Sequence, residues 1–536
     1  MATQQARTTT HRREGGAHEA AGGKRVFLSD PSRRVSPVAT EPIASDFAAF
    51  IGGPLGRFAR AGTQRLWTPI RVLIVASLTF LSLGFLAKAN CIQGNMVDGV
   101  AVLDWAGNRQ YTSACYNDIV PLYGGRGLDA PGFPYAYSWV EGERTRYMEY
   151  PVLAGIFQWI MAVITRAIYP AVEVLPLAIP EVAVYFSLSA LVMGMMWVCV
   201  VRLVAELAGN RVWDAILVAC SPLVIMHAFT NWDIPSILAA TLALWAFSRR
   251  NAWMAGVWIG IGISIKLWPL FLLGAYFVLS VRSRNFVPLV KMTVATVVTW
   301  VVCNVGVWLA YPQAWGEFYR LNTTRGWEWT TIYAVISREF GWAGFDGPGT
   351  PTTLNTVSFI LFLGACAAIA ALGIMVARRP RVAELCYLIV AAFLLTNKVW
   401  SPQYSLWLVV LAALALPNWR LIFAWALTDA LTWPVLMWHM MGEDNKGVPG
   451  HFLGIFVLGR DGFIIAIAVL VIRQMLGKRV DPVRRDHDGH DPLAGELDDE
   501  IVPVVSQSPV KKPAEATDVN LEAEAHASRD VKHVAE

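Results

Sequence analysis

The feature that most constrains this chain is a series of long apolar runs separated by short polar breaks between residues 70 and 472. A bilayer core offers backbone groups no water to bond, so a run that crosses it is a helix or a strand of a closed barrel. These runs are too long, and too poor in alternation, for barrel strands. Only 16% of the 536 residues are charged, against about 25% in soluble domains. The sequence therefore predicts an all-α polytopic membrane protein.

The runs and their flanking charges predict about twelve transmembrane helices. We place them at residues 70–90, 181–201, 213–228, 234–248, 252–265, 268–281, 287–310, 354–377, 382–396, 404–417, 421–438 and 452–472. A further run, residues 152–169, is expected to be an interfacial helix that follows the first external loop. If it does not cross, the breaks rich in Arg and Lys all fall in the cytoplasm, as the positive-inside rule requires.

This topology predicts a multi-pass protein of the plasma membrane with both termini in the cytoplasm. The two largest polar loops, residues 91–150 and 311–353, then lie outside. We expect an active site that faces outward, near the membrane interface.

Two polar tails flank the helices. Residues 1–65 are rich in Arg, Thr, Gly and Ala, and residues 479–536 mix acidic and basic residues without aromatics. Both compositions are typical of disordered segments. The expected organisation is a disordered cytoplasmic tail (1–65), a transmembrane domain (66–478) and a second disordered cytoplasmic tail (479–536).

Seven cysteines are present, and five of them lie inside apolar runs, where packing roles are expected. Cys91 and Cys115 lie in the first polar loop. For an external loop, a disulfide between them and a pair of free thiols are both compatible with the sequence.

The first loop is long, acidic and rich in tyrosine, and a carboxylate at the membrane surface can act as general base toward a hydroxyl. Asp118 lies between Tyr116 and Tyr123, and Glu149 precedes Tyr150-Pro151. For any single acid, a solvated position or a helix N-cap is the structural alternative.

The break at residues 227–235 holds two polar candidates. Asp233 precedes Pro235, which suits the start of a helix as well as it suits catalysis. Asn231 is a candidate for binding a substrate hydroxyl.

Lys266 ends an apolar run just before Pro269. A lysine in such a run is costly and therefore a functional candidate, here for a lipid phosphate. Snorkelling from a helix end is the alternative, and the sequence favours neither.

The second large loop contributes Arg320 and Arg325, whose guanidinium groups suit bidentate phosphate contacts. Solvated loop cations are the alternative for each. Lys398, Gln403 and Tyr404 lie in a polar break between two later helices, where they are candidates for binding a head group.

No Walker motif, dinucleotide-binding loop or zinc-ligand spacing is present. The sequence gives no support for ATP-driven transport or redox chemistry, and we expect no cofactor. No residues are assigned to a metal, and the sequence does not establish whether the protein requires one.

Several short motifs, in this order, resemble the GT-C class of polytopic glycosyltransferases, in particular glycosyltransferase family 87 of actinobacteria. They are Asp118 with Tyr123, Phe133-Pro134-Tyr135, Glu149-Tyr150-Pro151, Gly262 to Lys266 with Pro269, Arg325, and Lys398 with Ser401-Pro402-Gln403-Tyr404. The resemblance covers about residues 70–472. A departure is Val152, where many members carry a second proline after Tyr150-Pro151.

The resemblance implies an enzyme that moves a sugar, most often mannose, from a polyprenyl-phosphate carrier to an envelope glycolipid or glycan on the outer face. By the same resemblance, Asp118 is the base of an inverting displacement, and Lys266, Arg325 and Lys398 bind the carrier phosphate. Partners would be the lipid-linked donor, the acceptor and the bilayer, without nucleic acid.

Two other classes remain open at the level of sequence. A lipid or solute transporter, or flippase, would also have broken helices and buried charges, although its site would lie near mid-membrane. A scaffold for envelope assembly would have no need of Asp118. The sequence does not distinguish the sugar, the acceptor or the linkage.

Overall fold

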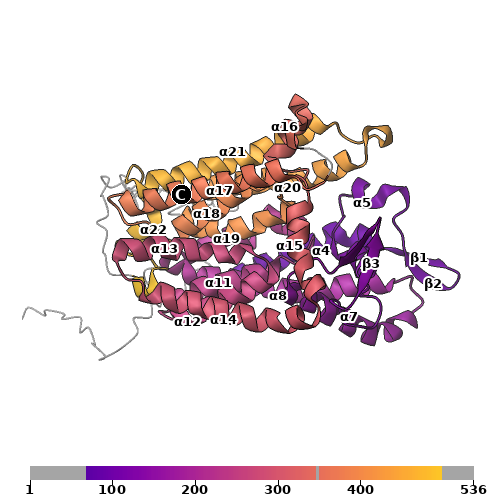
Figure 1. Ribbon diagram of the computed structural model, residues 1–536. Helices are drawn as coiled ribbons and strands as arrows, with labels where there is room; N and C mark the ends of the chain where they lie inside the picture. The colour runs from indigo at the N-terminus through magenta and orange to yellow at the C-terminus, as the bar shows by residue number, and fades with distance from the viewer. Residues whose placement is uncertain (1–67, 346–348, 498–536) are drawn as a thin grey trace, which may run out of the picture.

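The computed structural model describes residues 68–345 and 349–497. Helices run side by side along one axis, and four short strands gather at one end of the bundle, called here the strand end (Figure 1). Within these described residues, seven helices are long and apolar enough to cross a membrane: α4 (Pro69–Lys88, continued by a 3-10 turn to Ile92), α7 (Val152–Glu173), α8 (Glu181–Leu207), α14 (Val287–Ala310), α17 (Thr352–Met375), α20 (Trp419–Met440) and α21 (Gly450–Met475).

Shorter apolar helices complete the bundle. They are α11 (Ile234–Ser248), α12 (Ala252–Ile265), η5 with α13 (Trp268–Phe271 and Leu272–Ser283), α18 (Val382–Thr396), and η7 with α19 (Pro402–Tyr404 and Ser405–Ala415). This architecture confirms the predicted all-α polytopic class. The number of crossings stays a prediction, because length and composition alone qualify seven helices.

The short helices tend to lie inside and the long ones outside. Every residue of α19 is buried, whereas α17 buries only Leu354, Ser358 and Gly373. A helix too short to cross the bilayer alone can be accommodated when its ends meet protein instead of lipid. The short helices therefore bring polar loops deep into the strand end.

Two glycines bring α12 close to α14. A Cβ atom at Gly256 would lie 2.2 Å from the carbonyl oxygen of Met292, and one at Gly260 would lie 2.7 Å from that of Thr296. Small residues four apart allow such close packing of helices in membranes. The contact fixes α12, whose last turn leads into Lys266.

The strand end holds the loop structures. The strands form two antiparallel hairpins, β1–β2 (Gly94–Val97 and Val100–Leu103) and β3–β4 (Ser138–Glu141 and Arg144–Tyr147). The helices there are α5 (Arg109–Thr112), α6 (Ile119–Gly125), α15 (Pro312–Thr324) and α16 (Ile332–Phe340), and α15 runs across the bundle axis (Figure 1).

Helix α7 starts and finishes at the strand end, although its length would allow a crossing. Val152, at its start, lines a small cavity with Ile263 and Leu267 from the last turn of α12 and just beyond it. Near its other end, the Tyr169 hydroxyl donates to the carbonyl of Ile179, just before α8. The interfacial placement of α7 stays a prediction, because its length and composition also qualify it as a span.

The predicted helix at residues 213–228 is wrong in detail. The chain forms η4 (Gly209–Ala215), α9 (Ile216–Ala219) and α10 (Pro222–His227) instead. Pro222 cannot donate a backbone hydrogen bond to the preceding turn, and it disfavours helical geometry at Ser221. The Ser221 hydroxyl accepts the Leu223 N–H at 3.4 Å and restarts the helix.

The predicted disordered tail is also wrong over residues 479–497, which fold back on the end of the bundle opposite the strands (Figure 1). Arg381, fully buried, donates to Asp481 at 2.8 Å and to the carbonyls of Leu414 and Ala415, where α19 ends. The segment includes α22 (Pro482–Arg485) and η9 (Gly495–Leu497). The rest of that tail, and the predicted tail 1–65, lie outside the described residues.

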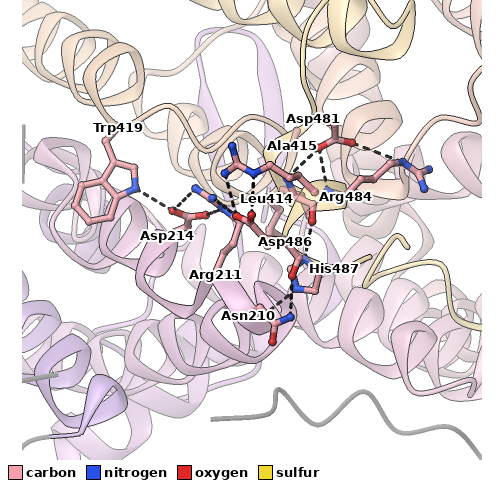
Figure 2. Close-up of polar contacts among 12 residues, drawn as sticks. Asn210, Arg211, Asp214, Leu414, Ala415, Trp419, Asp481, Arg484, Asp486 and His487 are labelled. Carbon is pink, nitrogen blue, oxygen red and sulfur yellow. Dashed lines mark hydrogen bonds and ion pairs between the residues drawn. The ribbon is translucent and has the colours of Figure 1, made fainter. Parts of the chain in front are cut away.

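A second part of this segment binds the turn after α8 (Figure 2). Arg211 donates to Asp214 and to Asp486, both at 2.6 Å. The His487 Nε2 atom accepts the Asn210 N–H at 2.9 Å. The composition of the tail gave no sign that it folds. Asp486 and His487 bond residues that lie about 270 positions earlier in the chain, and no local periodicity marks such contacts.

Candidate active site

Asp118 is held in place by its backbone. Its N–H donates to the carbonyl of Thr230 at 2.8 Å, and a disulfide joins Cys115, three residues earlier, to Cys91 after α4. Asp118 immediately precedes α6, yet its side chain caps no backbone N–H of that helix. The carboxylate is therefore available for other partners.

Asn231 joins three segments of the chain. Its Nδ2 atom donates to Asp118 Oδ2 at 2.7 Å and to the Tyr150 hydroxyl at 2.9 Å. Its Oδ1 atom accepts the Trp232 N–H at 2.6 Å, and Lys266 Nζ lies 3.4 Å away. With both N–H groups in use, the amide has one orientation that satisfies all partners. The predicted candidates Asp118, Asn231 and Lys266 thus meet at one site.

Lys266 forms a buried ion pair with Asp233, with Nζ and Oδ2 3.0 Å apart. The Trp407 indole N–H donates to the other carboxylate oxygen of Asp233 at 2.8 Å, and Lys266 lies 5.2 Å from the Tyr404 ring centre. Burial lowers the pKa of Lys266, but the combined attraction of Asp233, Tyr404 and Asp118 raises the pKa overall. The Asp233 side chain accepts no hydrogen bond from the backbone N–H groups that start α11. Its carboxylate forms the ion pair with Lys266 instead of capping the helix.

Burial also perturbs Asp118. Protein crowds its carboxyl on most sides, although part of the residue stays accessible. This burial raises the pKa of the Asp118 carboxyl above its ordinary value, despite opposing contributions from the Asn231 hydrogen bond and the Lys266 charge. A carboxylate with a raised pKa is a stronger proton acceptor once ionised.

A second cluster forms around Lys398, whose side chain is 6% exposed. Its Nζ donates to the backbone carbonyl of Arg325 at 2.6 Å and to the side-chain oxygen of Asn355 at 2.5 Å, both uncharged acceptors. Burial, with a smaller contribution from the Arg325 charge, lowers the pKa of Lys398 to about 8. This cation is therefore desolvated without full compensation, which favours binding of an anion.

Glu328 limits the positive charge of this second cluster. Its Oε1 atom accepts the Ser401 hydroxyl at 2.9 Å and lies 3.7 Å from the Arg325 guanidinium, which is 37% exposed. Burial raises the pKa of Glu328, with Arg325 the main opposing influence and Asp118 also acting to raise it. The Lys398 cluster therefore lies within electrostatic reach of Asp118.

Tyr404 lies between the two clusters. Lys266 Nζ lies 5.2 Å from the centre of its ring, and three residues before it the Ser401 hydroxyl donates to Glu328 of the second cluster. Its ring stacks on Trp407 with centroids 4.0 Å apart, and its neighbour Gln403 is buried. A substrate between the clusters would meet a carboxylate on one side and two cations on the other.

Three predicted candidates bind elsewhere. Arg320 is held by Glu317 on α15, at 2.7 and 2.5 Å, and is no longer an open phosphate ligand. Glu149 accepts two hydrogen bonds from Arg126, both at 2.6 Å. The Tyr123 hydroxyl donates to Glu181 at 3.0 Å, so it supports α8.

The sequence reasoning did not single out several residues of the site. Asn355 and Trp407 carried no local signal, because their partners lie 43 and 174 residues away. Glu328 had one, since it stands three residues after Arg325. Over the described ranges, the His, Cys, Asp and Glu side chains form no group of three that could hold a metal ion.

Comparison with known protein families gives a match over part of the chain. Residues 150–402 match the model of glycosyltransferase family 87. The match includes Asn231, Lys266 and Lys398 and begins after Asp118. No curated protein matches the chain.

Among solved structures, the chain is similar to the crystal structure of ArnT from Cupriavidus metallidurans bound to undecaprenyl phosphate. The TM-score is 0.35 at 13% identity, over 76% of this chain and 78% of that chain. The family match by itself confirms the resemblance inferred from the motifs. The chain is a multi-pass membrane glycosyltransferase whose residues 150–402 match family 87.

Proposed function

We propose that the protein transfers a sugar, with mannose the first candidate, from a polyprenyl-phosphate carrier to an envelope glycolipid or glycan. The observation that carries the proposal is that two groups lie in polar breaks at the strand end: the half-buried carboxylate of Asp118, which accepts a hydrogen bond from Asn231, and the buried cation Lys398, which donates to the Arg325 carbonyl. A base for a hydroxyl and a cation for a phosphate are the two groups that such a transfer needs.

In the proposed reaction, the acceptor hydroxyl oxygen attacks the anomeric carbon of the donor sugar. The bond from that carbon to the phosphate oxygen breaks, and the polyprenyl phosphate leaves with the electron pair. Asp118 takes the hydroxyl proton, using an oxygen that Asn231 does not occupy. A single displacement of this kind inverts the anomeric centre.

The leaving phosphate gains charge as the bond breaks. Lys398 and Arg325 are the side chains that would meet it, and each can add a charge-assisted hydrogen bond. Lys266 takes a different role in this proposal from the one expected. Paired with Asp233, it orients Asn231 and thereby Asp118.

Orientation is part of the proposal. Several basic breaks lie at the end opposite the strands, among them the one at Arg379 and Arg381, which bind the folded C-terminal segment. Placing that end in the cytoplasm satisfies the positive-inside rule and directs the site outward in the plasma membrane.

The proposal is tested with purified protein in liposomes. Radiolabelled mannose is supplied on polyprenyl phosphate or on a nucleotide, with a crude envelope glycolipid fraction as acceptor. We expect transfer from the lipid-linked donor alone. Transfer from the nucleotide donor would refute the carrier assignment, and transfer from neither, repeated with the arabinose carrier, would refute the proposed reaction.

A further inference from the structure

An apolar groove of about 540 Å³ runs between α4 and α8 on the side of the bundle. Its walls come from both helices and from one loop residue: Leu78, Leu81, Ser82, Phe85, Ser187, Ala190, Leu191, Gly194, Met195, Val198 and Phe229. Of the two serines, Ser187 donates to a carbonyl of its own helix at 2.7 Å. The groove therefore has almost nothing to offer a polar ligand.

Small residues on α8 form the floor of the groove. Ala190 and Gly194 are four residues apart, so they lie on one face of the helix. A Cβ atom at Gly194 would lie 3.9 Å from Leu81 and 4.0 Å from Phe229, at ordinary contact distance. The position has room for a side chain, and the space in front of it is left open.

The groove ends beside the residues that hold Asp118. Phe229, which bounds it, is followed in the chain by Thr230 and Asn231, which bond the backbone and the carboxylate of Asp118. Along α8 the groove extends from Ser187 to Val198, or roughly 16 Å at 1.5 Å per residue. A hydrocarbon tail that lies extended along the helices can occupy this length.

We propose that this groove binds the hydrocarbon tail of the acceptor, so that the acceptor is itself a lipid. This inference rests on the proposed function. The two helices are candidate membrane spans, so the groove opens to hydrocarbon and an apolar chain is its occupant. The tail belongs to the acceptor because Asp118, the proposed base, is the site residue tied to Phe229 through the adjoining loop.

The donor tail is assigned elsewhere for the same reason. The proposed phosphate ligand Lys398 follows α18 and bonds Asn355 on α17, whereas the groove is formed by α4 and α8. Two lipid substrates would thus approach from different sides and meet at Tyr404.

The expected change in the acceptor KM when the groove is blocked depends on the lipid that surrounds the helices. A tail in lipid is already among apolar neighbours, so the groove gains packing and position but no hydrophobic transfer energy. Blocking it should raise the acceptor KM by about three- to tenfold, the range of a loss of packing and alignment rather than of a charged contact.

The test fills the groove with Gly194→Leu. Gly364→Leu is the matched control, because Gly364 lies in α17 with open space at its Cβ. Two synthetic acceptors share one mannoside head and carry a hexadecyl or a butyl tail. We expect Gly194→Leu to raise the KM for the hexadecyl acceptor only, with the butyl acceptor and the donor unchanged, and Gly364→Leu to change none of them.

Direct labelling separates failure of the groove from failure of the reaction. A hexadecyl mannoside with a photoreactive group in its tail should label α4 or α8, and Gly194→Leu should remove the label even if no transfer is observed. A rise in donor KM instead would overturn the assignment to the acceptor. Equal labelling by a photoreactive phosphatidylcholine would show an annular lipid site and also overturn it.

Discussion

Asn231 is the residue that organises the candidate base. It donates one N–H to Asp118 and the other to Tyr150, and its side-chain oxygen lies within hydrogen-bond distance of Lys266. Since Lys266 is itself neutralised by Asp233, the site holds Asp118 in position without a cation bonded directly to it. A direct ion pair would have lowered the pKa of Asp118 and weakened it as a base.

The two loop cations should respond differently to removal. Lys398→Gln should raise the donor KM by about tenfold or more, because a hydrogen bond to a charged group contributes about 1.5–3 kcal/mol. Arg320→Gln should change it by less than about twofold, since Glu317 already occupies that guanidinium. Steady-state kinetics in liposomes checks both, and equal effects of the two substitutions would remove Lys398 from the phosphate site.

The pH profile of sugar transfer should also fall on its alkaline side, which is called here the alkaline limb. The Lys398 pKa is lowered to about 8, so the cation predominates below that pH and is lost as the pH rises through it. We expect kcat/KM for the donor, which reports the free enzyme, to fall above about pH 8. Lys398→Arg keeps its charge there and should move the limb to higher pH. A limb unchanged in Lys398→Arg would assign it to another group.

At the scale of single residues, the sequence identified candidate residues of the site better than it identified the residues that they bond. Lys266 stood out because it interrupts an apolar run, where a charge is costly. Asp118, Asn231 and Lys398 stood out as polar groups in the breaks between predicted helices. Their neighbours could not be assigned: Asp233 neutralises Lys266 across 33 residues, and that pairing depends on how α11 and α12 pack.

At the scale of elements, the folded C-terminal segment acts as a clamp on the end opposite the site. Arg381→Met should destabilise the protein by about 3–5 kcal/mol, because it leaves the buried Asp481 with only the more distant Arg484, at 3.6 Å, as its cation and removes the Arg381 donor from the carbonyl of Leu414. Thermal unfolding in detergent measures the loss.

Two further variants make that test specific. Arg485→Met should cost less than about 1 kcal/mol, since Arg485 is exposed and pairs with its neighbour Asp486. The double variant Arg381→Met/Asp481→Asn should recover part of the loss, because the uncompensated charge is gone. Additive losses would contradict the ion-pair account.

Predictions of helices were correct where the apolar character of the run alone decided the structure. The long apolar runs became helices, because burial of the backbone in hydrocarbon leaves few alternatives. They failed at the break near Pro222 and over residues 479–497. In that segment stability comes from a few long-range ion pairs, such as Arg211 with Asp486, that leave no mark on local composition.

At the scale of the whole molecule, topology depends on α7. If it lies at the interface, cysteines placed at Val140 and Leu177, exposed positions before and after it, should both react with an impermeant maleimide from the same side. A cysteine at Lys478, after α21, should react only once the membrane is permeabilised. Opposite labelling of the first two positions would show that α7 crosses.

The arrangement of the whole chain explains why residues far apart form one site. Breaks at residues 116–118, 230–233, 266 and 397–404 all lie at the strand end, because the intervening helices return the chain there. Sequence predicted this gathering through charge and hydropathy. It did not predict the depth of the site, which depends on the short helices α11, α12 and α19.

The central claim is that Asp118 is the base of sugar transfer. The most direct measurement compares transfer from radiolabelled polyprenyl-phosphate mannose by wild type, Asp118→Asn and Asp129→Asn in liposomes, the last being the same change at an exposed position of the same loop. We expect a loss of about a hundredfold or more in Asp118→Asn, as for removal of a general base, and an unchanged rate in Asp129→Asn. Wild-type transfer by a folded Asp118→Asn protein would contradict it.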